Sequence, residues 1–135
     1  MNDEQSKRLA DAAEAVMQAA DALSEARESI ADRRFDSEQE RERMTAGQQM
    51  ASRLDNAGKR IEDALRKAAV ASAASGRAGA WATYSEATGA AREARGLAKA
   101  AAEADGSAQK RVRGQEAWDR LEGALDAAAS LVFPD

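Results

Sequence analysis

The sequence predicts an all-α protein: an antiparallel helical bundle of three to four long, alanine-rich amphipathic helices, or extended helical hairpins. Of its 135 residues 36 are Ala, the residue with the highest helix propensity, whereas Gly contributes 9 and Pro one. Residues that favour strands are scarce, and only five side chains are aromatic. We therefore expect a single domain over residues 1–135, with helix content above about 75%, against ~30–35% in typical globular proteins.

A first helix is expected over residues 3–34. Its large aliphatic residues recur every seven positions, and alanine follows three positions after each of the first three. This pattern is a heptad seam that allows a neighbouring helix to approach closely. Asn2 or Asp3 can cap the start of the helix. The seam consists of Leu9, Val16, Leu23 and Ile30, with Ala12, Ala19 and Ala26 between them.

A break is expected after this seam, within residues 32–37. Ser37 followed by Glu40 has the form of a capping box, which favours a new helix over residues 38–74. A single helix that continues through this charged segment is the alternative. Gly47 and the segment 56–58 are points at which the second helix can bend. Its apolar stripe consists of Met50, Leu54, Ile61, Leu65 and Ala68.

Two glycine-containing segments, residues 75–79 and 105–107, predict turns. The helix expected between them, over residues 80–104, has heptad rows made almost entirely of alanine. We expect it to pack tightly against another helix of the chain or against another subunit. Because short turns join long helices, sequential helices should be antiparallel neighbours.

The last helix is expected over residues 108–132. Ser107 is its predicted N-cap, and Pro134 ends it because proline disfavours helix in the residue before it. The residues expected to be buried in this helix are Val112, Trp118, Leu121, Leu125, Ala128 and Val132. Over the whole chain, the strongest candidates for the core are Leu23, Ile61, Leu121 and Leu125.

Enzymatic chemistry is not expected. The chain has no His and no Cys, so it lacks the usual general base, the usual nucleophile triads and the ligands of typical zinc sites. Ser107 and Lys110 have the Ser-x-x-Lys spacing of some acyl-transfer enzymes, but the companion motifs are missing. We expect no catalytic residues, no cofactor, no metal and no small-molecule substrate.

The middle of the chain is basic, because residues 46–104 carry nine bases and six acids. On the second helix bases recur every seven residues, and on the third they stand at i, i+3 and i+7. A hairpin about Gly76 would bring position 60 near position 93, so that both stripes share one side. The candidate contacts for a partner or for phosphate groups are Arg53, Arg60, Lys67, Arg92, Arg95 and Lys99. The alternative is a solvated flank, or a face that meets the acidic first helix.

Heptad patterning without catalytic residues favours a non-enzymatic protein–protein interaction module: a helical adaptor, inhibitor or assembly component, able to self-associate. Alanine faces bury little area, so such helices can recruit a partner chain. A nucleic-acid-binding helical protein that uses the basic stripe is the alternative. A second alternative is an amphipathic binder of lipid or granule surfaces, although the narrow apolar faces make membrane binding the less favoured interpretation.

The composition also suggests an origin and a location. Arginine outnumbers lysine 15 to 5, which together with the alanine excess favours a GC-rich genome, bacterial or phage. A virion or assembly component and a phage-encoded inhibitor of a host defence system both fit. No stretch is long and apolar enough to span a membrane, and the N-terminal residues do not resemble a secretory signal. We expect a cytoplasmic protein, or a virion-associated one if it is phage-encoded.

Overall fold

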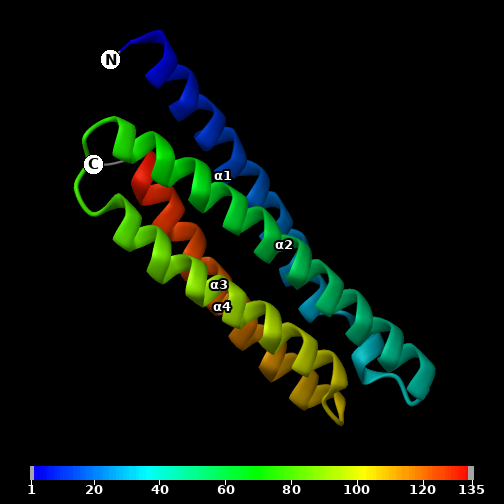
Figure 1. The fold of residues 1–135 in the computed structure, drawn as a ribbon. Coiled ribbons are helices and arrows are strands. Elements are labelled where there is room, and N and C mark those ends of the chain that lie inside the picture. The colour runs from blue at the N-terminus through cyan, green and yellow to red at the C-terminus, as the bar shows by residue number, and fades with distance from the viewer. Residues whose placement is uncertain (1, 134–135) are drawn as a thin grey trace.

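A computed structural model describes residues 2–133, in which four antiparallel α-helices pack against one another (Figure 1). Helices make up 89% of the residues described, with no strand among them. The predicted all-α bundle is therefore confirmed. The elements are α1 (Asp3–Ile30), a short 3-10 helix η1 (Arg33–Asp36), α2 (Glu40–Ala74), α3 (Ala80–Glu103) and α4 (Ser107–Val132).

Helix α2 is the central helix, because it contacts each of the other three. Helices α1 and α3 flank it and have no contact with each other in the described part of the chain. Helix α4 closes the bundle by contacting α1, α2 and α3. In Figure 1, α2 and α3 lie toward the viewer and α4 runs behind α3. The start of α1 and the end of α4 lie at the same end of the bundle.

The cap of α1 is confirmed, whereas the cap predicted for α2 is wrong. The Asn2 side chain accepts a hydrogen bond from the backbone of Gln5 at 2.8 Å, and the Gln5 side chain accepts one from the backbone of Asn2 at 3.2 Å. Helix α2 begins at Glu40, with Gln39 as an N-cap that makes no side-chain cap bond. The Ser37 hydroxyl instead accepts from the backbone N–H of Gln39 at 3.1 Å, as in a local turn.

The start of α4 also differs from the prediction. Ser107 is the first helical residue, and the N-cap is Gly106, whose φ of 82° lies in the left-handed region open to glycine. The two predicted turns are both present, with positive φ at Gly76 and Gly79 in the first and at Gly106 in the second. The expected role of Pro134 falls outside the described residues.

The predicted break after the first helix is confirmed, and a buried aromatic residue fixes its geometry. Helix α1 ends at Ile30 and not at residue 34, and η1 follows it. Phe35 of η1 is fully buried at this end of the bundle. Arg111 of α4 lies over the Phe35 ring at 5.5 Å and donates to the backbone oxygen of Ile30 at 3.3 Å and to the carboxylate of Asp36 at 2.7 Å. One guanidinium therefore holds the α1–α2 connection against α4.

Small residues dominate the core. Twenty of the 32 buried apolar residues are alanines, and the buried face of α3 contains only alanine and Thr88. The alanine-rich third helix packs against α2 and α4 of the same chain, which is the first of the two predicted arrangements. Large side chains are concentrated on α2. The largest fully buried ones are Phe35, Met50, Leu54, Ile61, Leu65 and Leu121.

Two of the residues expected in the core are placed differently. Val112 is 54% exposed, because the buried face of α4 begins with Lys110 and Gly114, and Val112 lies about 200° around the helix from Lys110. Leu125 is only partly buried, at the edge of the core. Leu23 of α1 and Ile61 of α2 are buried, as are the remaining predicted core residues of α4.

Two glycines inside the helices, Gly58 and Gly114, mark positions at which neighbouring helices approach closely. Helix α2 runs without interruption through Gly47 and Gly58. A Cβ at Gly58 would lie 2.6 Å from Cγ of Arg95 on α3, and a Cβ at Gly114 would lie 2.5 Å from Sδ of Met50 on α2. Any residue other than glycine at these two positions would place its Cβ where a side chain of the neighbouring helix already lies.

Alanine substitution should distinguish such contact glycines from solvent-facing ones. Gly58→Ala should destabilise the protein, because the added methyl group displaces the Arg95 stem near its base. Gly123→Ala is the control, since nothing lies within 4 Å of the Cβ built there. It should stabilise the protein by about 0.5–1 kcal/mol through helix propensity. Urea unfolding measures both, and a stabilising Gly58→Ala would contradict the close contact.

Candidate interaction surfaces

An ion-pair cluster joins α2 to α3. The guanidinium of Arg95 donates to carboxylate oxygens of Asp55 at 2.8 Å and Glu62 at 2.7 Å, and Arg92 reaches Glu62 at 3.1 Å. Gly58 gives the Arg95 stem room to lie on α2. The hydrogen bond from Arg95 holds the pKa of Asp55 below its usual value, and Asp55 in turn raises the pKa of Arg95. Two of the three predicted contact bases of α3 are therefore engaged within the protein.

The contact bases predicted on α2 lie on its other flank. Arg60 lines a shallow hollow with Asp21 and Glu25 of α1, and Lys67 lines another with Glu14. The Lys67 amine also pairs with Asp63 at 3.1 Å. Arg53, seven residues before Arg60, lies on the same flank. The pairing of Glu62 with Arg92 agrees with the predicted hairpin register. However, residues 60 and 62 point about 200° apart on a helix, so the two stripes do not share one side.

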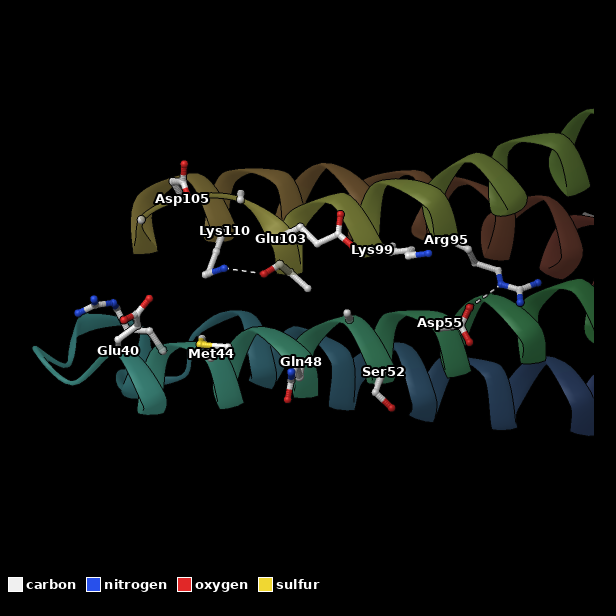
Figure 2. Close-up of a pocket in the computed structure, with 15 residues that line it drawn as sticks. Glu40, Met44, Gln48, Ser52, Asp55, Arg95, Lys99, Glu103, Asp105 and Lys110 are labelled. Atoms are coloured by element: carbon white, nitrogen blue, oxygen red, sulfur yellow. Dashed lines mark hydrogen bonds and ion pairs between the residues drawn. The ribbon is translucent and has the colours of Figure 1, made fainter.

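A groove lies between the first half of α2 and the C-terminal part of α3, and extends to the α3–α4 turn (Figure 2). It encloses about 770 Å³. Lys99, the remaining predicted base of α3, lies along it. Its charges are balanced, with four acids and four bases, so it favours no ligand of one sign. They are Glu40, Asp55, Glu103 and Asp105, and Arg43, Arg95, Lys99 and Lys110.

Lys110 is the one buried base at this groove among the described residues, and its amine is engaged by the backbone. The residue is 7% exposed, and its Nζ donates to the carbonyl oxygen of Ala102 at 2.6 Å (Figure 2). The last carbonyls of a helix lack partners within the helix and favour a cation. Gly47 of α2 lies beside this amine, and a Cβ there would be in ordinary van der Waals contact with Nζ at 3.6 Å. Lys110 therefore ties the end of α3 to α4, a role that the spacing from Ser107 did not predict.

An uncharged strip lies along the junction of α1 and α4. The Trp118 indole donates to the backbone oxygen of Leu23 at 2.9 Å, and the Arg27 guanidinium lies 4.7 Å from the Trp118 ring centre. Arg111 meets Ile30 seven residues away on both helices, which fixes an antiparallel register. Two apolar rows therefore run side by side toward the start of α1. We call them the α1–α4 strip: Leu9, Ala13, Met17 and Ala20 on α1, and Leu125 and Ala129 on α4.

The strip is open to solvent. Met17 is 65% exposed, the highest value among the large apolar residues described. Leu9, Ala13, Leu125 and Ala129 are only partly buried, at the margin of the core. Within residues 2–133 no ion pair bridges α1 and α4, whereas ion pairs do bridge α2 to α3 and α3 to α4. The sequence signal for this strip is the row of apolar residues beside the heptad seam of α1, which heptad spacing alone did not separate from the core.

Carboxylates border the strip on both helices, and we call these the acidic rims. On α1 they recur every seven residues, in a row that Lys7 begins. All six are exposed, and none forms an ion pair among the described residues. Two accept hydrogen bonds from glutamines, Glu14 from Gln18 and Asp119 from Gln115. The rims comprise Glu14, Asp21 and Glu28 on α1, and Asp119, Glu122 and Asp126 on α4.

Residues 2–133 contain no group of three potential ligands positioned to share a metal ion, and no helix in this range is long and apolar enough to cross a membrane. Comparison of the chain with protein-family models, with curated proteins and with solved structures finds no match. Function is therefore inferred from the surfaces described above.

The lowered carboxylate pKa values predict acid sensitivity. Hydrogen bonds from arginine lower the pKa of Asp36 and of Asp55 in the folded state. A depressed folded-state pKa adds stability above the ordinary value of about 3.9, and this stability is lost as the pH falls through the folded-state pKa. We expect the free energy of unfolding to fall below about pH 4.

Asp55→Asn should weaken this acid dependence and cost about 0.2–1 kcal/mol at pH 7, the range for a partly exposed ion pair. Asp105→Asn is the matched control, because Asp105 is exposed in a turn and forms no ion pair with a described residue. Urea unfolding at pH 7, 4 and 3 measures both variants. An Asp55→Asn curve parallel to that of the unsubstituted protein would contradict the contribution of Asp55.

Proposed function

We propose that the protein is a non-enzymatic protein–protein interaction module whose partner binds the α1–α4 strip. The observation that carries the proposal is the uncharged surface from Leu9 to Ala20, beside Leu125 and Ala129. Carboxylates that form no ion pair with a described residue border it on both helices. Covering an exposed Met side chain contributes about 1.5–3 kcal/mol. A contiguous exposed apolar surface rimmed by polar residues is typical of interaction sites.

The arrangement of the bundle supports the proposal. Helices α2 and α3 join through ion pairs, and α4 joins α3 through Arg120 and Glu93 at 2.6 Å. Among the described residues no ion pair joins α1 to α2 or to α4. Toward the start of α1, the α1–α4 junction ends in apolar side chains. An adaptor, an inhibitor that occludes a surface and an assembly component would each use such a face. A virion component and an inhibitor of a host defence system are the two settings that the composition favours.

Site-specific photo-cross-linking tests the proposal. In one variant p-benzoylphenylalanine replaces Met17, and in the control it replaces Met44, which is 53% exposed against 65% for Met17. After irradiation in cells that carry the gene, position 17 should give a discrete polypeptide adduct and position 44 should not. Equal adducts at both positions, nuclease-sensitive adducts or lipid adducts at position 17 would contradict the proposal.

A further inference from the structure

We propose that the element that occupies the α1–α4 strip is a basic amphipathic helix of a partner protein. This inference rests on the proposed function and specifies the partner's chemistry. Three observations carry it: the shape of the junction, the small residues along it, and the charge of its rims.

The shape of the junction fits a helix. Two parallel apolar rows, one on each of two adjacent antiparallel helices, form a shallow valley into which the side-chain ridge of a third helix can pack. From Leu9 to Ala20 the valley spans twelve residues of α1, or about 16 Å at a rise of 1.5 Å per step. A partner helix of about three to four turns covers it. The alanines at positions 13, 20 and 129 allow close approach, while Met17 and Leu125 supply most of the apolar area.

The charge of the rims specifies the flanks of the partner helix. Glu14, Asp21 and Glu28 border the valley on one side, and Asp119, Glu122 and Asp126 border it on the other. Glu14 and Asp21 also line hollows with Lys67 and Arg60 of α2, but no ion pair joins them among the described residues. Arg27 lies beyond the end of the strip, over the Trp118 ring. A helix whose apolar face is flanked by Lys or Arg on both edges would pair with both rims. Each exposed pair contributes about 0.2–1 kcal/mol, and together they set orientation and association rate.

The same charges argue against other occupants. A second copy of this chain would bring its own acidic rims against these, and like charges placed together oppose association. Nucleic acid and anionic membranes carry phosphate groups, which the rims repel. A basic helix is therefore the occupant that matches both the apolar strip and its border.

Peptide binding tests the inference. The first probe is a fluorescent 16-residue helical peptide with a Leu/Ala face flanked on both edges by Lys, and the second has Glu at every Lys position. Fluorescence anisotropy should show the Lys peptide binding with a Kd of about 100 µM or tighter, at least about tenfold tighter than the Glu peptide. Its affinity should fall with added salt. Equal binding of the two peptides, or no binding of the Lys peptide, would overturn the inference.

Matched variants locate the binding surface. Met17→Asp should weaken binding of the Lys peptide at least about tenfold, and Met44→Asp should leave it unchanged. The double variant Asp21→Lys/Glu122→Lys should also weaken it about tenfold. A Glu86→Lys/Glu103→Lys variant, with the same charge change on exposed residues of α3, should not. Circular dichroism and thermal melting establish that each variant is folded. Equal losses from the strip and control variants would place the peptide elsewhere and overturn the inference.

The two proposals fail separately. A polypeptide adduct at position 17 together with no binding of the Lys peptide leaves the interaction function standing and rejects the basic helix. An adduct between two copies of this chain would likewise keep the interaction function and reject the basic helix. Absence of any polypeptide adduct at position 17 would reject the proposed function itself.

Discussion

Close approach of α2 to its neighbours is the constraint on which the other features of this bundle depend. Most of the buried apolar residues are alanines, so a helix can be covered only if the next backbone comes near it. At the tightest points glycine replaces alanine. Gly58 accommodates the stem of Arg95, and Gly114 accommodates Met50. The ion pairs between α2 and α3 exist because these contacts are close.

The same constraint accounts for the exposed strip. The large buried side chains are concentrated on α2, and α3 is covered by alanine contacts with α2 and α4. Helix α1 contacts only α2 and α4 among the helices described, so its apolar arc, which is wider than a heptad seam, extends past the core. Met17 and Ala20 stand on that extension. Exposing such a face to water costs little free energy because it is mostly alanine. Its apolar area contributes to binding when a partner covers it.

Helix periodicity predicted most of the fold, because alanine content and seven-residue spacing are local signals. The four helices follow from them. The cap at Asn2 was predicted from residue type, and the break before α2 was predicted from a capping box that the structure does not form. Contacts between side chains and distant parts of the chain are not local signals, so the positions of three side chains were not predicted. Phe35 fills the end of the bundle from a segment that looked charged, Lys110 bends to a backbone carbonyl, and Val112 then faces solvent. The two basic stripes are separated because the bases of α3 meet Glu62, which points about 200° away from Arg60 on α2.

The exposed strip is a binding surface only if the isolated protein folds around its alanine-rich core without a partner. Equilibrium urea unfolding of the isolated protein tests this most directly. Leu121 is fully buried, so Leu121→Ala should lower the free energy of unfolding by about 2–5 kcal/mol in a single cooperative transition. Val112→Ala, at an exposed site on the same helix, should change it by less than about 0.5 kcal/mol. Gradual unfolding without a cooperative transition, with no response to Leu121→Ala, would contradict a self-contained bundle and show that the helices order only on another molecule.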